Sequence, residues 1–473
     1  MPTTKIVATL GPATQTKEAI RDLILAGADV FRINASHAQK GDIPNLVTSV
    51  REVAADLHTM TGILLDLQGP KIRLGMFEGG KCELQTGSRF TITTETIEGN
   101  AERASTTYVD FAKDVRAGDR VLLNDGSVEL KALDSDGVKV LFEVVSGGPV
   151  GNRKGINLPG VKVSTPSLTK KDMADLQEAL TVGVDMVALS FVRKREDVLR
   201  LRHFLENNDV SLPIVSKIEK PEGWQNLDGI LEESDGVMVA RGDLGVEMAL
   251  EKVPAIQKAI ILRARQYGKF VITATQMLES MIQSNVPTRA EVSDVANAIY
   301  DGTDAVMLSA ETSAGKFPIE AVKMMARIAN ESEACVKQRG YQEPSRPQNG
   351  NDPQIIAHLA FEAAQFVEAS AIAVFSVSGS SGRLVSSYRP VMPVYVFTHK
   401  AEVARQLSVN YAVRAVVVPQ MESTDAMLAV VDEVLCGRRS LKPGDMVVFV
   451  AGQPIGRKGT TNLLKLHRVG ELR

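Results

Sequence analysis

The sequence predicts an α/β protein built on a (β/α)8 TIM barrel, with an inserted all-β lid domain after the third strand and a C-terminal α/β domain. Three observations lead to this prediction. Eight short apolar runs alternate with longer amphipathic stretches, as parallel strands alternate with crossover helices. A long stretch with hairpin signals separates the third run from the fourth. A Pro-, Gly- and Asn-rich segment precedes a further set of alternating runs.

The eight apolar runs are almost continuously hydrophobic, as strands covered on both faces are. Most gaps between them fit one helix and two loops, which favours a closed barrel over the alternative, an open doubly wound sheet. The runs cover residues 5–11, 30–36, 62–69, 186–192, 213–219, 236–242, 270–276 and 305–311.

The lid domain is predicted at residues 70–165. Asp125-Gly126 and Asp136-Gly137 each lie between strand-like runs, and Asp-Gly in that position is a hairpin signal. Thr169, three residues before Asp172, predicts the capped start of the helix that resumes the barrel. The predicted domains are therefore 1–69 and 166–340 for the two parts of the barrel, 70–165 for the lid and 341–473 for the C-terminal domain.

The C-terminal domain follows a predicted linker at 340–353, rich in Pro, Gly, Asn, Gln and Ser. Its strand-like runs alternate with helical stretches, which indicates a second α/β layer structure. These runs cover residues 371–377, 394–397, 413–418 and 446–451.

Composition narrows the classes of function. The 54 basic and 57 acidic residues leave a net charge of −3, which gives no electrostatic basis for a nucleic-acid or anionic-membrane partner. No apolar run approaches the ~18 residues of a membrane helix, and the first residues contain no signal-peptide pattern, so we expect a cytoplasmic protein. Cys82, Cys335 and Cys436 are far apart in sequence and are expected to be buried thiols.

Polar residues follow six of the eight predicted strands, and in a parallel barrel the carboxyl ends of the strands form one mouth. Lys217 and Glu219 alternate with apolar residues inside a buried strand, where unpaired charges are costly, so they are expected to be paired or to hold a ligand. The segments concerned are 32–37, 66–73, 216–219, 240–243, 273–276 and 309–311.

Glu219 and Asp243 follow adjacent strands and are predicted to share a divalent cation, since Mg²⁺ binds through one or two carboxylates plus water and substrate oxygens. The cations expected around it favour an anion of several charges, phosphate above all; they are Lys217, Arg32, Arg73 and Arg241. None of the three Gly-Lys pairs precedes Ser or Thr, so a nucleotide is not held by a Walker loop.

Over essentially its whole length the sequence resembles the bacterial pyruvate kinases. The resemblance rests on KIVATLGPA at 5–13, IVSKIEKPEG at 214–223, MVARGDLG at 238–245, ATQMLESM at 274–281 and PTRAE at 287–291. Ala35 stands where the family usually has an aromatic residue, and Trp224 where it usually has an aliphatic one. These two departures concern local packing.

The resemblance implies phosphoryl transfer from phosphoenolpyruvate to ADP, giving pyruvate and ATP in the last step of glycolysis. It implies that Glu219 and Asp243 bind Mg²⁺, with Mn²⁺ as an alternative, and that Lys217 neutralises the phosphoryl group in flight. The main-chain amides of Arg241, Gly242 and Asp243 would hold the substrate carboxylate. Thr275 would lie near the carbon that gains a proton, with Arg32 as a further catalytic and substrate-binding residue. The residues implied to face the ADP phosphates are Arg32, Asn34, His37, Arg73 and Lys154.

Many members of this family need K⁺, in a pocket that matches Asn34, Ser36, Asp66 and the backbone of Leu67, and those members carry Glu at the position of Lys71. The ammonium of Lys71 is a single positive charge of the same sign as K⁺, so it would replace that cation. The resemblance to this potassium-independent branch therefore predicts that K⁺ is not required.

The C-terminal domain contains a candidate anion site, since VFSVSGSSGR at 374–383 predicts a strand, a Ser/Gly loop and the start of a helix. In the family this loop binds the phosphate of an allosteric effector, which implies a role for Ser376, Ser378, Gly379, Ser380 and Ser381. The family also implies a homotetramer.

Two alternatives stay open. One is a lyase barrel that acts on phosphoenolpyruvate or an oxo acid, and the other is a catalytically silent effector-binding protein. The first has no need of the lid with Arg73 and Lys154, and the second predicts the loss of Lys217 or the carboxylates, all of which are present.

Overall fold

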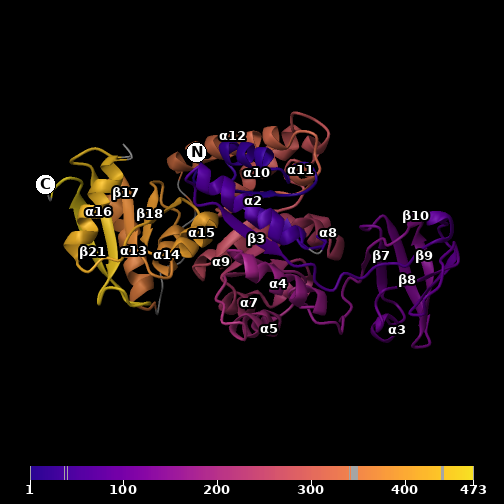
Figure 1. Ribbon diagram of the computed structural model, residues 1–473. Coiled ribbons are helices and arrows are strands. Elements are labelled where there is room, and N and C mark those ends of the chain that lie inside the picture. The colour runs from indigo at the N-terminus through magenta and orange to yellow at the C-terminus, as the bar shows by residue number, and fades with distance from the viewer. Residues whose placement is uncertain are drawn as a thin grey trace.

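The computed structural model describes residues 2–36, 38–39, 41–339, 341, 350–437 and 441–471. The β insertion lies at one end of an elongated molecule and the C-terminal sheet at the other, with the barrel between them (Figure 1). The predicted fold class is confirmed. The domain boundaries given above stay predictions.

The eight predicted barrel strands are all present, and they form one closed parallel barrel in the order β1-β16-β15-β14-β13-β12-β3-β2. Apolar side chains from these strands fill its interior and a second, larger core between strands and helices. The strands are β1 Lys5–Thr9, β2 Val30–Asn34, β3 Gly62–Asp66, β12 Met186–Leu189, β13 Ile214–Ile218, β14 Gly236–Ala240, β15 Phe270–Ala274 and β16 Ala305–Leu308.

The longer barrel helices bury apolar side chains in the core between helices and strands. The Thr169 hydroxyl accepts the Asp172 amide and the Asp172 carboxylate accepts the Thr169 amide, so the predicted cap of α4 is confirmed. The helices are α1 Lys17–Ala26, α2 Asp42–Asp56, α4 Lys170–Val182, α5 Arg195–Glu206, α6 Pro221–Gln225, α7 Leu227–Glu233, α8 Arg241–Glu247, α9 Val253–Gln266, α10 Arg289–Tyr300, α11 Ala310–Ser313 and α12 Pro318–Arg339, with short 3-10 turns η2 Leu250–Lys252 and η3 Glu279–Ile282.

The insertion is an all-β unit with its own apolar core. Both predicted hairpins are confirmed: Asn124 and Asp125 have positive φ in the turn between β7 and β8, and Gly137 does so between β8 and β9. The elements are η1 Glu78–Gly80, β4 Lys81–Leu84, β5 Arg89–Thr93, β6 Arg103–Ser105, α3 Phe111–Asp114, β7 Arg120–Leu123, β8 Val128–Ser135, β9 Lys139–Ser146, β10 Gly148–Gly151 and β11 Ile156–Asn157. They form a six-stranded sheet, β11-β7-β8-β9-β5-β6, and a pair, β10-β4.

The C-terminal sheet has the order β19-β18-β17-β20-β21. Its first four strands in sequence match the predicted runs, but β21 was not expected, because its exposed polar residues interrupt the apolar pattern at an antiparallel edge. The elements are α13 Asp352–Phe366, β17 Ala371–Phe375, α14 Ser380–Ser387, β18 Val394–Thr398, α15 Ala401–Gln406, η4 Leu407–Val409, β19 Val413–Val417, α16 Thr424–Gly437, β20 Met446–Gly452 and β21 Thr461–Arg468.

Three smaller expectations have mixed outcomes. Most of the predicted linker, 342–349 and residue 340, lies outside the described residues. Cys82, Cys335 and Cys436 are free thiols, but each is half-buried, so the expectation of fully buried thiols is wrong. Ala35 is fully buried in the barrel core and Trp224 packs against that core, so both departures from the family pattern are accommodated by packing.

Candidate active site

A buried cluster of charges lies at the carboxyl end of β13. The Lys217 ammonium is 2.8 Å from Glu219 Oε1 and 3.2 Å from Asp66 Oδ1, and it donates to Ser190 Oγ at 2.9 Å. The side chains of Lys217, Asp66 and Glu219 are only 12%, 1% and 2% exposed. The strand thus places a paired cation at the mouth, as the alternation of charged and apolar residues predicted.

Arg32 at the end of β2 shares Asp66 with Lys217. Its Nε is 2.7 Å from Asp66 Oδ2, and its Nη1 donates to Thr9 Oγ1 at 3.2 Å. Two strand ends absent from the six predicted segments therefore contribute to this cluster, through Thr9 and Ser190. A lone Ser or Thr at a strand end is common, so the sequence around Thr9 and Ser190 gives no signal by itself. Their role could have been predicted only from the fact that all eight strand ends meet at one mouth.

Burial and neighbouring charges shift the pKa values of this cluster. Burial alone would raise the pKa of Asp66, but Lys217 and Arg32 hold it below the ordinary value. Burial alone would lower the pKa of Lys217, but Asp66 and Glu219 hold it above the ordinary value. Burial, together with the nearby charge of Asp243, raises the pKa of Glu219 to about 6 against the effect of Lys217. Lys217 is therefore a permanent cation at this site.

Asp243 lies in the first turn of α8, close enough to Glu219 and Lys217 to affect their charges. Its carboxylate makes no hydrogen bond or ion pair with any residue that the structure describes. Within the same residues, no group of three or more His, Cys, Asp or Glu side chains is arranged to hold a metal ion. A pair of hard carboxylates fits a divalent cation that completes its shell with water and substrate oxygens, which is the preference of Mg²⁺.

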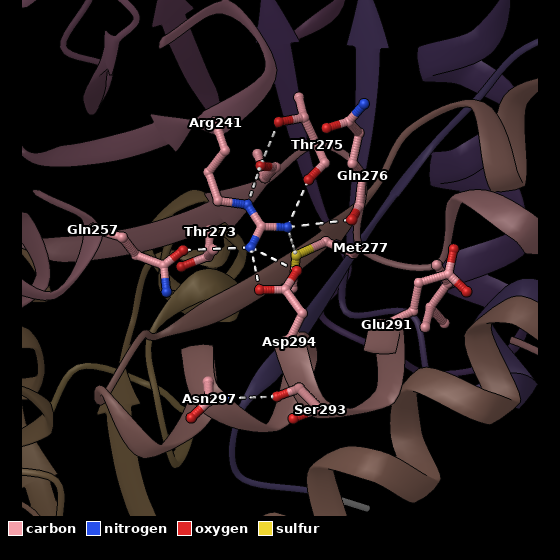
Figure 2. A network of polar contacts seen from close by, with 12 residues as sticks. Arg241, Gln257, Thr273, Thr275, Gln276, Met277, Glu291, Ser293, Asp294 and Asn297 are labelled. Carbon is pink, nitrogen blue, oxygen red and sulfur yellow. Dashed lines mark hydrogen bonds and ion pairs between the residues drawn. The ribbon is translucent and has the colours of Figure 1, made fainter. Parts of the chain in front are cut away.

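The Arg241 guanidinium is bonded to α10 and to the loop after β15, and its contribution to the positive charge of the mouth stays a prediction. Its guanidinium is 2.7 Å from Asp294 on α10, and it donates to the carbonyls of Ala274 and Thr275 at 3.2 and 2.7 Å. Figure 2 shows the side chain inserted among Gln257, Asp294 and the loop after β15. The side chain anchors this loop, because its planar guanidinium donates hydrogen bonds to several acceptors at once.

The anchored loop carries Thr275, whose Oγ1 accepts the main-chain N–H of Gly242 at 2.7 Å. Thr275 and Gln276 both have positive φ, of 69° and 52°. Such backbone strain is held in place by surrounding contacts and concentrates at functional sites.

The residues expected to face ADP come partly from the barrel and partly from the insertion. Asn34 ends β2, whereas Arg73 and Lys154 belong to adjacent segments of the insertion, with Arg73 donating to the Arg153 carbonyl at 2.9 Å. His37 lies outside the described residues. A cleft of about 820 Å³ is lined by Asp243 from the barrel and Asp125 from the insertion, among others.

Three of the residues matching the monovalent-cation pocket meet at the ends of β2 and β3. Asn34 is the register partner of Asp66, and the Leu67 carbonyl accepts the Ser190 hydroxyl at 2.7 Å. Lys71 is exposed on the wall of a hollow that Asp243 also lines. Its ammonium makes no hydrogen bond or ion pair with the residues described.

The Ser/Gly loop of the C-terminal domain borders a separate hollow. Ser376, Ser378, Ser380 and Ser381 line it, and Gly379, with φ of 79°, precedes α14. Ser381 is buried and bonded to Thr461 on β21. Arg457 and Lys458 also line this hollow, and the sequence analysis missed them because they belong to the loop before the unexpected strand β21.

Comparisons with known proteins agree over the whole chain. The family model "Pyruvate kinase, barrel domain" matches residues 1–322, and "Pyruvate kinase, alpha/beta domain" matches residues 354–467. A pyruvate kinase of Mycobacterium tuberculosis (strain ATCC 25618 / H37Rv) is 45% identical over 472 residues, which cover 99% of this chain and 98% of the relative. One of Geobacillus stearothermophilus is 42% identical, covering 99% of this chain and 81% of the relative.

A solved structure gives the same result. The crystal structure of a pyruvate kinase from Cryptosporidium parvum matches with a TM-score of 0.92 at 38% identity, and the match covers 99% of this chain and 96% of that one. No helix in the described part of the chain is long and apolar enough to cross a membrane. The family models, the relatives and the solved structure all agree, and the chain therefore belongs to the pyruvate kinase family and is a phosphotransferase.

Proposed function

We propose that the barrel mouth transfers the phosphoryl group of phosphoenolpyruvate to ADP and that enolpyruvate is then protonated, which gives pyruvate and ATP. The observation that carries this assignment is the buried cluster in which Lys217 is flanked by Asp66 and Glu219 beside Asp243. A preorganised cation in a water-poor site stabilises charge that develops in a transition state.

Glu219 and Asp243 would hold the divalent cation, Mg²⁺ or in its place Mn²⁺. When bound, the cation neutralises charge on the substrate's carboxylate and phosphoryl oxygens. Lys217 provides a second, fixed positive charge for the phosphoryl group, and Arg32, whose Nε is bonded to Asp66, provides a third from the neighbouring strand.

The main-chain amides of Arg241, Gly242 and Asp243 would bind the substrate carboxylate. In support, the Gly242 amide already donates to an oxygen, the Thr275 hydroxyl, at 2.7 Å. This contact supports a position of Thr275 beside the same end of the substrate, where its hydroxyl would stand near the methylene carbon that gains the proton.

Arg32, Asn34, His37, Arg73 and Lys154 would face the ADP phosphates. Arg73 and Lys154 belong to the insertion, so nucleotide binding would bring the insertion toward the barrel as a lid. Closure of this kind excludes water from the transfer step.

Activity would not require K⁺, because the Lys71 ammonium stands in for that cation beside Asn34, Ser36, Asp66 and the carbonyl of Leu67. In support, Lys71 follows Asp66 by five residues and carries a cation with no ion-pair partner among the described residues.

A phosphorylated effector would bind the loop that contains Ser376, Ser378, Gly379, Ser380 and Ser381. Arg457 and Lys458, which also line the hollow, support an anionic ligand. A homotetramer is supported by the open edge of β21 and by exposed apolar side chains on α13, namely Ile355, Leu359 and Phe366. The cytoplasmic location stays a prediction.

The test is a coupled assay that follows pyruvate and ATP together, with and without ADP, sugar phosphates and AMP. Equal amounts of pyruvate and ATP, formed only with ADP and a divalent cation, are expected. Pyruvate formation independent of ADP would favour the lyase alternative, and no turnover would favour the catalytically silent one. Glu219→Gln is the inactive control.

A further inference from the structure

A second buried ion pair lies next to the proposed cation site and has no role in the reaction as assigned so far. Lys220 Nζ is 3.0 Å from Glu247 Oε1, and these side chains are 10% and 2% exposed. Two charges removed from water are retained only with good geometry, and the loss of one leaves the other buried and unpaired. The pair therefore fixes the separation of the segments that carry it.

These segments are the ones that carry the two proposed cation ligands. Lys220 directly follows Glu219 at the end of β13. Glu247 is four residues after Asp243, one turn along α8, and both residues line the same hollow with Lys220. The ion pair thus joins the backbone behind one carboxylate to the helix that presents the other.

The insertion is tied to the same pair. Asn157, at the end of β11, donates from Nδ2 to Glu247 Oε1 at 3.2 Å. The other oxygen, Glu247 Oε2, is buried and has no hydrogen-bond partner among the described residues. The position of Glu247 is therefore held by one contact from the barrel and one from the insertion.

We propose that Lys220 and Glu247 are positioning residues that set the separation of the Glu219 and Asp243 carboxylates, and that Asn157 makes this separation depend on the insertion. This inference rests on the proposed cation site. Mg²⁺ and Mn²⁺ bind oxygen ligands in a near-octahedral arrangement, so a small displacement of one carboxylate weakens binding. Groups that orient metal ligands from behind typically change affinity by about 10–100-fold when mutated.

The experiment measures Mn²⁺ binding to the full chain without substrates, by the electron paramagnetic resonance of free Mn²⁺. Lys220→Met removes a positive charge near the cation, so electrostatics alone would tighten Mn²⁺ binding. Loss of positioning instead raises the Mn²⁺ Kd by about tenfold, which is the expected result. An unchanged or lower Kd would overturn the proposal.

Two variants serve as matched controls. Lys220→Arg keeps the ion pair and should restore the Mn²⁺ Kd to within about twofold of the wild-type value. Arg202→Gln removes a more exposed ion pair, between α5 and Asp235 at the opposite ends of the same strands, and should leave the Kd unchanged. If Arg202→Gln also raised the Mn²⁺ Kd tenfold, loss of the cation would be a general result of weakening the barrel, and the proposal would be wrong.

A further variant keeps the test decisive if Lys220→Met does not fold. Asn157→Leu removes only the bond from the insertion and should raise the Mn²⁺ Kd about two- to threefold; no change would contradict the link to the insertion. The same measurement distinguishes a failure of the proposed cation site from a failure of this inference. If Glu219 and Asp243 do not hold the cation, the variants Glu219→Gln and Asp243→Asn will still bind Mn²⁺. If those two variants lose Mn²⁺ while Lys220→Met does not, only the inference fails.

Discussion

At the scale of single residues, Lys217 illustrates how a buried charge is held ready for use. Its ammonium contacts two carboxylates and one hydroxyl in a nearly closed environment. Such a charge needs no reorganisation when negative charge develops on a neighbouring phosphoryl group. The cost of removing the Lys217 ammonium from water is offset in the folded protein by its ion pairs with Asp66 and Glu219. The site is therefore preorganised before substrates bind.

We therefore expect Lys217→Ala to lower kcat by about 10²-fold or more, on the scale of losing one preorganised charge donor, with a smaller change in the KM for phosphoenolpyruvate. Steady-state kinetics measures both. The control is Lys5→Ala, which removes an equally buried lysine at the other end of the barrel, where its ammonium donates to the Val413 carbonyl. A Lys217→Ala enzyme within fivefold of the wild-type kcat would exclude Lys217 from the mechanism.

The positions of Lys217 and Glu219 could be predicted because charges in an apolar run must be paired or liganded. The direction of Arg241 could not, since a long side chain after a strand can point into the mouth or back over the helices. Asp294, its ion-pair partner, lies far away in the sequence on α10. Tertiary acceptors decide such orientations, and local sequence does not contain them.

Lys71 gives a second prediction at this scale. Two like charges about 4 Å apart repel by several kcal/mol at an effective dielectric near 20, so Lys71 and a bound K⁺ exclude each other. We expect full activity with Mg²⁺ in buffers free of K⁺ and NH₄⁺, and strong K⁺ dependence in Lys71→Glu. Activity is measured at constant ionic strength, with Na⁺ as the control ion. Activation of the wild-type enzyme more than about threefold by K⁺ would disprove the replacement.

At the scale of elements, the loop after β15 depends on the start of α10. Glu291 caps this helix by accepting the Thr288 amide at 2.7 Å, and it also accepts the Ser280 amide at 2.7 Å from η3. Partial burial alone would raise the pKa of Glu291, but the hydrogen bonds from Ser280 and Thr288 hold it below the ordinary value of 4.5. The carboxylate form is thus favoured by folding.

Glu291→Gln removes the negative charge that accepts these hydrogen bonds and should lower the free energy of unfolding by about 1 kcal/mol at neutral pH, the difference between a charge-assisted and a neutral hydrogen bond. Because the folded-state pKa is depressed, this stability is present above pH 4.5 and is lost as pH falls through the lower folded-state value. Calorimetric Tm values across this range should converge for the two proteins in acid. Glu320→Gln, an exposed first-turn change on α12, is the control and should show no such convergence.

Elements were predictable where the hydrophobic pattern was unambiguous. The eight barrel strands are covered on both faces, so each appears as a continuous apolar run. Strand β21 pairs with β20 on one side only, and its Asn462 and Lys465 face outward, which gives a mixed pattern that resembles a loop. Missing it also concealed Arg457 and Lys458, whose loop is placed by that edge strand.

At the scale of the whole molecule, the Ser/Gly loop is connected to the barrel through the C-terminal domain. A Cβ at Gly379 would lie 3.2 Å from Val403 and from Leu407, so the loop lies against α15 and η4. The last residue of η4, Val409, is fully buried within the apolar interior of the barrel. An anion bound at this loop would thus act on an element that reaches the barrel core, while the residues proposed to transfer the phosphoryl group lie at the opposite, carboxyl end of the strands.

This separation predicts that effector binding and chemistry can be uncoupled by one substitution. Ser381 is buried against Thr461, so a carboxylate there would disturb folding, whereas Ser378 is half-buried and contacts only Ser380 among described side chains. Ser378→Asp places a negative charge beside the expected phosphate and should raise the half-maximal concentration of an activating sugar phosphate or AMP by at least about tenfold, since like charges in one site repel. Maximal kcat should stay at the wild-type value, because Asp66, Lys217 and Glu219 are untouched. Ser378→Ala is the neutral control and should retain most of the response. Loss of turnover with an intact response to phosphates would show that the loop belongs to the catalytic machinery and not to a regulatory site.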